Sequence, residues 1–265
     1  MPLPTPGPDR TALVTGASSG IGAMIARELS RRGHHVTLVA RSADKLGALA
    51  EELANADVIA MDLADRAARA SLPDLVSQHG RVPDILVNNA GLSTLGAVSK
   101  SDPAAEMNMI EVDVVAVADL CSRILPGMVE RGRGAVLNVA STAAFQPLPG
   151  QAGYGAGKAF VLSYTQSLAG ELRGTGVTAT TLCPGPVQTG FGERAGFSDE
   201  DAEAALPAVM WVSAEDVAKS AVDGMAKGRL VVIPGTVNRV AAALSQVTPR
   251  SLLLPILAKG HPGLR

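Results

Sequence analysis

The sequence predicts an α/β fold in which a doubly wound parallel sheet of about seven strands lies between two layers of helices. Three observations point to this fold. Short apolar runs alternate with longer amphipathic segments, the apolar runs lack the polar alternation of a one-sided sheet, and a glycine-rich turn follows the first run. Strands joined by helices form right-handed crossovers, so the sheet is expected to be parallel and buried on both faces.

The elements follow one another in a regular order. The first apolar run leads directly into glycine, Gly33 suits the end of the first helix, and Leu46, Leu49 and Leu53 form a stripe on the second helix. The expected strands are residues 11–15, 35–40, 58–61, 84–88, 134–140, 178–183 and 229–233. The expected helices are residues 21–32, 43–55, 65–79, 103–131 and 154–173.

The chain divides into a leader, one domain and a tail. Residues 1–10 are rich in proline and are expected to be a disordered leader. Residues 11–236 are expected to form a single domain, because no repeat or linker interrupts them. Residues 237–265 are apolar but broken by prolines, and we expect them to pack on the body or on a partner subunit. A membrane-surface anchor is the alternative.

Composition excludes several classes of function. The 265 residues carry a net charge of −2 and only 3% are aromatic, which argues against nucleic-acid binding. Two cysteines, Cys121 and Cys183, are too few for a disulfide framework or a zinc site, and we expect both to be buried and no metal to be bound. The scattered histidines are expected at the surface. They are His34, His35, His79 and His261.

Targeting signals are absent from the sequence pattern. No run approaches about 18 uninterrupted apolar residues, so no transmembrane helix is expected. The proline-rich start has no apolar core of a signal peptide. The sequence therefore predicts a cytoplasmic location.

The glycine-rich turn after the first strand predicts a dinucleotide site. Gly16 permits a tight exit from the strand, Gly20 lets backbone approach a phosphate, and Gly22 lets the helix pack closely on the strand. The helix start then offers free N–H groups to an anion. The neighbours expected to contact the cofactor here are Ser18, Ser19 and Ile21.

The residues after the second strand favour NADP(H) over NAD(H). An acidic residue at this point would bind the adenosine ribose and repel a 2′-phosphate, but the sequence has Arg41 and Ser42 instead. Arg41 can pair with a 2′-phosphate. Asp62 and Leu63, after the third strand, are expected beside the adenine.

Three polar residues predict the reacting site. Tyr154 and Lys158 lie four residues apart and share one helix face. An ammonium beside the phenol favours the phenolate, which suits Tyr154 to act as a general acid/base on an alcohol or ketone. Ser141 ends the fifth strand, at the edge where open α/β sheets bind ligands, and can hold the substrate oxygen.

Taken together, these motifs resemble those of the short-chain dehydrogenase/reductase family, in its compact single-domain branch. The resemblance covers about residues 10 to 235 and implies a Rossmann-like fold and hydride transfer to or from a nicotinamide. It rests on the segments 15–22, 88–91 and 154–158, on Ser141, and on Pro184, Gly185 and Thr189. The family pattern implies that Tyr154, Lys158, Asn89, Ala90, Gly91, Pro184, Gly185, Val187 and Thr189 also line the cofactor site.

One position departs from the family pattern. An asparagine usually completes the catalytic group on the fourth long helix, and here Asp113 takes its place. A carboxylate near Lys158 would stabilise the ammonium and alter the proton relay. We expect a working enzyme with a changed pH dependence.

The loops at the carboxyl edge predict the kind of substrate. Residues 91–95 and 142–150 are mostly apolar and uncharged, and residues 191–211 could close as a lid. These loops favour a bulky, uncharged ketone, secondary alcohol or aldehyde. The family also implies a homodimer or homotetramer through the two long helices, whose stripes are Val114, Val117, Leu120, Phe160, Leu162 and Leu168.

Two other hypotheses keep the same fold. A sensor that binds NADP(H) without catalysis would need the glycine turn but not Ser141, Tyr154 and Lys158, so their presence favours an enzyme. Epimerisation or dehydration with the same cofactor is the third hypothesis, and the lack of a longer C-terminal substrate domain argues against it.

Overall fold

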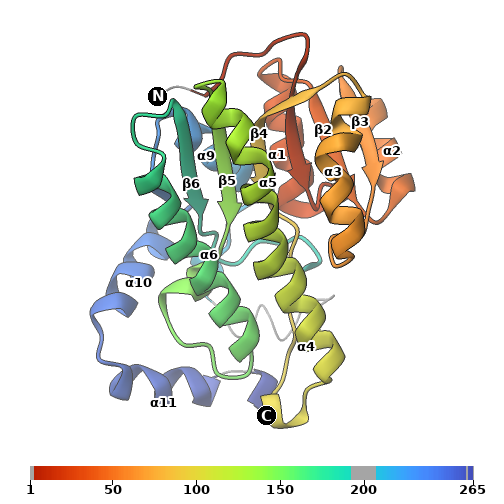
Figure 1. Cartoon of the computed structure of the whole chain (residues 1–265). Coiled ribbons are helices and arrows are strands. Elements are labelled where there is room, and N and C mark those ends of the chain that lie inside the picture. Colours follow the sequence, from red (N-terminus) through yellow and green to blue (C-terminus); the bar gives the residue numbers. More distant parts are fainter. Residues whose placement is uncertain (1–2, 192–206, 261, 265) are drawn as a thin grey trace.

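A computed structural model describes residues 3–191, 207–260 and 262–264. Its centre is a parallel sheet of seven strands in the order β3-β2-β1-β4-β5-β6-β7 (Figure 1). The predicted fold class is confirmed. The strands are β1 (Arg10–Thr15), β2 (Val36–Ala40), β3 (Ala56–Ala60), β4 (Val82–Asn88), β5 (Gly134–Val139), β6 (Val177–Leu182) and β7 (Val231–Val232).

Helices cover both faces of the sheet (Figure 1). On one face, α1 (Gly20–Arg31), α2 (Ala43–Glu52) and α9 (Ala214–Ala226) enclose a core built around Ile25, Leu38 and Val217. On the other face, α3 (Arg66–Gln78), α5 (Ala116–Glu130) and α6 (Ala152–Glu171) enclose a second core. The central strands are mostly apolar because both of their faces are buried, as the sequence pattern indicates.

The long helix expected over residues 103–131 is interrupted. It consists of α4 (Pro103–Ile110), a π-helical turn (Glu111–Val115) and α5. Such turns inside helices often occur at functional sites. Here the turn contains Asp113, which is 2% exposed. The irregular backbone thus occurs where the sequence departs from the family pattern.

The two ends of the chain contact the body. Leu3 packs against the first core, and the guanidinium groups of Arg133 and Arg81 donate hydrogen bonds to the carbonyl oxygens of Thr5 and Pro8. At the other end, α10 (Thr236–Val247) and α11 (Arg250–Gly260) follow β7, and α11 runs below the carboxyl edge of the sheet (Figure 1). From residue 236 to residue 260 the tail is therefore helical except at Thr248 and Pro249.

One expectation about side chains is wrong. His34 and His35 are buried rather than at the surface, and the His35 ring lies 3.0 Å from the hydroxyl of Thr11 and 3.4 Å from the carboxylate of Asp57. In the two helix stripes, Val117, Leu120, Leu162 and Leu168 are core residues and Phe160 is exposed, and the expected dimer or tetramer stays a prediction. Both cysteines are buried as expected. His261 and most of the expected lid, residues 192–206, lie outside the described residues.

Candidate functional site

The glycine-rich turn brings the backbone close to neighbouring strands. Gly16 and Gly20 have positive φ angles of 64° and 56°, which favour glycine. A Cβ atom on Gly16 would lie 2.8 Å from the Cα of Ala90. A Cβ atom on Gly22 would overlap the Asn89 amide and the Gly16 carbonyl. The turn thus needs all three glycines, as the sequence analysis expected.

The start of α1 is left open toward the turn. Ser19, its N-cap residue, makes no side-chain capping hydrogen bond, and no acidic residue lies in the first helical turn. Thr15 holds the facing loop, because its hydroxyl accepts hydrogen bonds from the N–H groups of Asn89 and Ala90 at 3.0 and 3.1 Å. Free N–H groups and an unopposed helix dipole fit a pyrophosphate here.

A single cleft of about 720 Å³ runs along the carboxyl edge of the sheet. It begins over the start of α1, passes the ends of β4 and β5, and reaches α11. All predicted site residues line it except Gly22 and Asp113. Those that line it are Gly16, Ser18, Ser19, Gly20, Ile21, Arg41, Ser42, Asp62, Leu63, Asn89, Ala90, Gly91, Ser141, Tyr154, Lys158, Pro184, Gly185, Val187 and Thr189.

The end of the cleft near β2 carries two cationic side chains. Arg41 follows β2, and Lys45 lies four residues later, near the start of α2. Asp62, after β3, points its carboxylate toward its own loop and accepts a hydrogen bond from the N–H of Ala64 at 2.9 Å. Sequence reasoning missed Lys45, although a second basic residue so soon after Arg41 was a readable signal. Two cations at this end fit the 2′-phosphate of NADP(H).

The three residues expected to react lie together where β5 meets α6. Lys158 is buried, and its Nζ atom lies 3.2 Å from the carbonyl oxygen of Val139 and 5.5 Å from the centre of the Tyr154 ring. Ser141 follows β5 and lies within hydrogen-bonding reach of the Tyr154 phenol. A carbonyl oxygen could therefore lie between a serine hydroxyl and a tyrosine phenol.

Asp113 lies behind Lys158 and pairs with it. One carboxylate oxygen lies 2.9 Å from Nζ of Lys158, and the other accepts a hydrogen bond from the N–H of Leu92 at 2.7 Å. Their side chains are 2% and 6% exposed. Asp113 therefore joins the π-helical turn to Lys158 and to the loop after β4, without reaching the cleft itself.

The pKa values of these groups depend on one another. Burial raises the pKa of Tyr154, while the ammonium of Lys158 and the hydroxyl of Ser141 oppose the rise and the carboxylate of Asp113 adds to it. Burial lowers the pKa of Lys158, but Asp113 and Tyr154 outweigh this effect and the net shift is upward. Lys158 is therefore charged at neutral pH.

The other half of the cleft is mostly apolar. Phe191 lies beside Tyr154 with ring centres 6.0 Å apart, and Gln146 and Gln151 supply polar groups. Apart from Lys158, none of the described side chains around this half is charged. Its apolar lining is Leu92, Val112, Leu148, Phe191, Met210, Trp211, Ile256 and Leu257. Sequence reasoning missed Ile256 and Leu257, because nothing local indicates that the tail folds back to the cleft.

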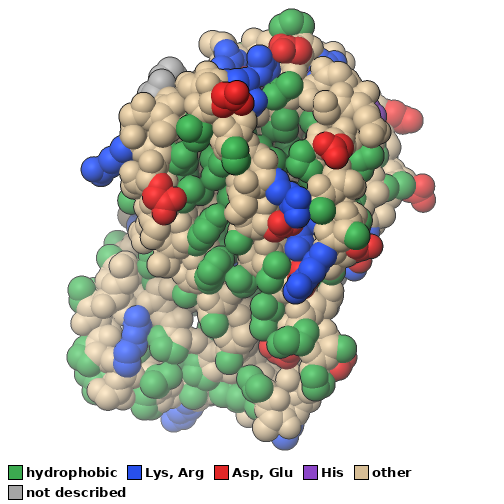
Figure 2. Space-filling model, viewed as in Figure 1, with side chains coloured by type: hydrophobic (Ala, Val, Ile, Leu, Met, Phe, Trp, Pro, Cys, Tyr) green, Lys and Arg blue, Asp and Glu red, His purple; other side chains and the backbone are tan. Residues whose placement is uncertain are grey.

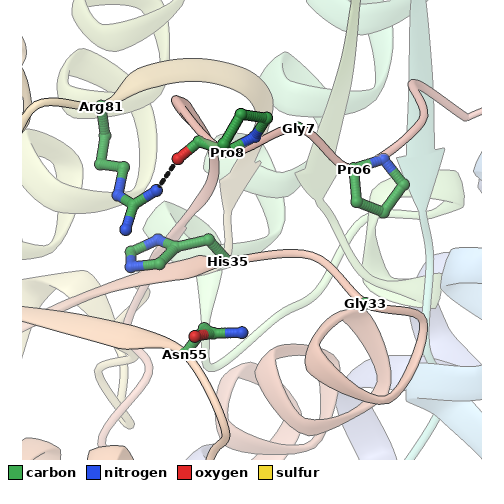
Figure 3. A pocket seen from close by; sticks show the side chains of 7 residues that line it. All are labelled: Pro6, Gly7, Pro8, Gly33, His35, Asn55 and Arg81. Carbon is green, nitrogen blue, oxygen red and sulfur yellow. Dashed lines mark hydrogen bonds between the residues drawn. The ribbon is translucent and has the colours of Figure 1, made fainter.

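A second, smaller hollow lies at the amino-terminal edge of the sheet (Figure 3). It has a volume of about 420 Å³ and lies between the segment Pro6–Pro8 and the residues His35, Asn55 and Arg81. Asp57 is 3.4 Å from Nε2 of His35. The hollow contains none of the predicted site residues. Among the residues that the structure describes, no cluster of side chains could hold a metal ion.

The fold and the cleft define a dinucleotide-binding enzyme of the oxidoreductase type. A family model described as "short chain dehydrogenase" matches residues 10–198. The chain belongs to the short-chain dehydrogenase/reductase family, and it is an oxidoreductase.

Relatives and solved structures are similar over most of the chain. An NADP-dependent 3-hydroxy acid dehydrogenase of Salmonella typhi is 36% identical over 217 residues, covering 76% of this chain and 88% of the relative. A short-chain dehydrogenase from Sphingobium yanoikuyae, in complex with NADPH, has a TM-score of 0.79 at 32% identity and covers 93% and 95% of the two chains. A bulky-bulky ketone specific alcohol dehydrogenase from Comamonas testosteroni has a TM-score of 0.75 at 29% identity, covering 96% and 95%.

Proposed function

We propose that this oxidoreductase transfers a hydride between NADP(H) and a bulky, apolar ketone, secondary alcohol or aldehyde. The observation that carries the proposal is the meeting of Ser141, Tyr154 and Lys158 between a glycine-rich cradle and an apolar half-cleft. NADP(H), when bound, supplies or accepts the hydride at its nicotinamide. The relative from Comamonas testosteroni, which is specific for bulky-bulky ketones, supports this class of substrate.

The residues of the chain would perform the proton chemistry. In reduction, the Tyr154 phenol donates its proton to the carbonyl oxygen, while the hydroxyl of Ser141 donates a second hydrogen bond that holds this oxygen. The ammonium of Lys158 stabilises the phenolate that remains. In oxidation the phenolate takes the proton back. Asp113, which touches neither substrate nor cofactor, keeps Lys158 charged and in place.

Selectivity for the cofactor would come from Arg41 and Lys45. Each can form a charge-assisted bond to a 2′-phosphate, and a hydrogen bond to a charged group contributes about 1.5–3 kcal/mol before solvent screening is discounted. Arg41 is exposed, so its share is at the lower end of this range. Replacing both residues by alanine should weaken NADPH binding by about tenfold or more and leave NADH binding unchanged.

The experiment measures the loss of reduced-nicotinamide absorbance with NADPH and with NADH, over apolar ketones and aldehydes of increasing bulk. Tyr154→Phe should abolish turnover and retain NADPH binding. Tyr164→Phe is the matched control, because Tyr164 lies on the same helix but stacks on Phe160 with ring centres 5.5 Å apart, outside the cleft. Full activity in Tyr154→Phe would refute the assignment of the acid/base. Tight NADPH binding without turnover of any carbonyl would favour the sensor.

A further inference from the structure

The helix α10 turns its apolar face away from the protein. The side chains buried against the body are Asn238, Ala242 and Ser245, and the Asn238 amide donates hydrogen bonds to the carbonyl oxygens of Met210 and Pro234. The opposite face carries large aliphatic residues at helical spacing, and a surface helix normally shows the reverse pattern. They are Val237, Val240, Leu244 and Val247, with 38%, 54%, 58% and 76% of their surface exposed.

The helix α11 carries a second set of exposed aliphatic residues. Leu252 and Ile256, four residues apart, are 62% and 70% exposed, and none of the side chains described from 250 to 259 is buried. Arg250 fixes the start of the helix, because its guanidinium donates hydrogen bonds to the carbonyl oxygens of Ser245 and Phe145. We call the exposed aliphatic residues of α10 and α11 together the outer face.

The charge around the outer face has one sign. Residues 236–260, which span α10 and α11, contain three basic residues, Arg239, Arg250 and Lys259, and no aspartate or glutamate, although the whole chain has a net charge of −2. Arg239 and Lys259 are exposed on the two helices. Figure 2, in the view of Figure 1, shows apolar and basic side chains and no acidic ones over α10 and α11, at the lower left.

The outer face adjoins the mouth of the cleft. Ile256 is largely exposed and also lines the cleft with Leu257. A surface on which the outer face rested would therefore meet the apolar half of the cleft directly.

We propose that the outer face binds the surface of an anionic phospholipid bilayer. An amphipathic segment with aliphatic residues on one side and only basic charges at its margins has the chemistry of an interfacial lipid-binding helix. The basic residues match anionic headgroups, and each contributes to attraction near the surface. A second copy of this chain fits less well, because a two-fold interface would oppose the same basic residues across it.

The proposed contact is peripheral and does not span the membrane. No helix in the described part of the chain is long and apolar enough to cross a membrane. A consequence that rests on the proposed function is that apolar substrates dissolved in the bilayer would reach the cleft past Ile256. The binding test below measures no turnover, so its result does not depend on that function.

The experiment is co-sedimentation of the full chain with vesicles of phosphatidylcholine alone and with vesicles of phosphatidylcholine and phosphatidylglycerol in equal parts. The protein should bind the second kind, and added salt should weaken binding. The double variant Val240→Ser, Leu244→Ser should weaken binding about tenfold or more. Its control is Val98→Ser, Val209→Ser, which removes two aliphatic side chains that are 61% and 68% exposed elsewhere.

The charge is tested separately. Arg239→Glu should weaken binding to the anionic vesicles about tenfold or more. Arg173→Glu, an exposed position after α6, is the control for the same change of net charge.

Three results would overturn the proposal. The first is that the protein binds both kinds of vesicle equally or binds neither. The second is that a test variant and its control change binding by the same amount. The third is that, without lipid, light scattering shows an oligomer that the variant Val240→Ser, Leu244→Ser dissociates. The last result would assign the outer face to a second copy. All four variants replace exposed residues, so unchanged melting temperatures verify that each is folded.

Discussion

The pair formed by Asp113 and Lys158 can be tested by removing one charge at a time. Asp113→Asn keeps the size of the side chain and an oxygen that can accept the Leu92 N–H bond, but it leaves the Lys158 ammonium in a site where its side chain is 6% exposed. Removing one partner of a buried ion pair costs about 3–5 kcal/mol. For a chain of this length, 1 kcal/mol corresponds to about 2 °C in Tm, so the variant should melt about 6–10 °C lower.

The assay is thermal unfolding at neutral pH of the wild type, both single variants and the double variant Asp113→Asn, Lys158→Met. The double variant removes both charges and should recover much of the loss, so the two effects should not add. Glu52→Gln is the control, because Glu52 pairs with Arg27 at 2.7 Å at an exposed site and should change stability by less than about 1 kcal/mol. Additive effects, or a single variant that melts like the wild type, would refute the buried ion pair.

The pH dependence of this stability has a definite sign. The pKa of Lys158 is raised in the folded protein: burial lowers it, but Asp113 and Tyr154 outweigh burial. A raised lysine pKa contributes stability that is fully present at neutral pH and is lost as the pH rises through the alkaline range. The difference in Tm between wild type and Asp113→Asn should therefore shrink at alkaline pH.

Three further predictions concern the same cleft and the core. Burial raises the pKa of Tyr154 and the Asp113 carboxylate raises it further, so Asp113→Asn should move the acid limb of alcohol oxidation to lower pH. If the acid limb of the kcat/KM pH profile stayed where it is in the wild type, Asp113 would have no effect on the pKa of Tyr154. Gly22→Ala should lower Tm and weaken NADPH binding, since its methyl group would overlap Asn89 and Gly16, whereas Gly47→Ala, in open space on α2, should stabilise by about 1 kcal/mol. Thermal unfolding and NADPH titration compare the two variants. Similar changes in Tm and in NADPH affinity would contradict the close packing of Gly22 against Asn89 and Gly16. Burial raises the pKa of Cys121 to about 11 and of Cys183 to about 12, so iodoacetamide should label neither thiol in the folded protein. Mass spectrometry checks this, with the denatured protein as control.

The alternation of elements and the cofactor cradle could be predicted because their signals are local. A parallel strand buried on both faces reads as an apolar run, and all seven expected runs correspond to strands of the sheet. Gly16 and Gly20 require positive φ angles in a turn between a strand and a helix, which a short segment of sequence already displays. The positions of Tyr154 and Lys158 on one helix face follow in the same way from helical spacing.

Features that depend on residues distant in sequence were decided only by the folded chain. The π-helical turn at Glu111–Val115 reads as an ordinary helix in the sequence, and the partners of its Asp113, which are Lys158 and the backbone of Leu92, are distant along the chain. His34 and His35 read as surface residues, but each is only 8% exposed, and the His35 ring contacts Thr11 and Asp57, which lie elsewhere in the sequence.

The sequence by itself thus determined the class of fold, the dinucleotide cradle and the residues that meet at the end of β5, since each follows from local spacing and from the parallel order of strands. Only the tertiary structure decided how the tail is used. Its apolar residues could equally have faced a core, but α10 buries Asn238 and Ser245 and exposes Val240 and Leu244. The physical reason is that a helical pattern specifies which residues share a face, while packing against the rest of the chain specifies which face is covered.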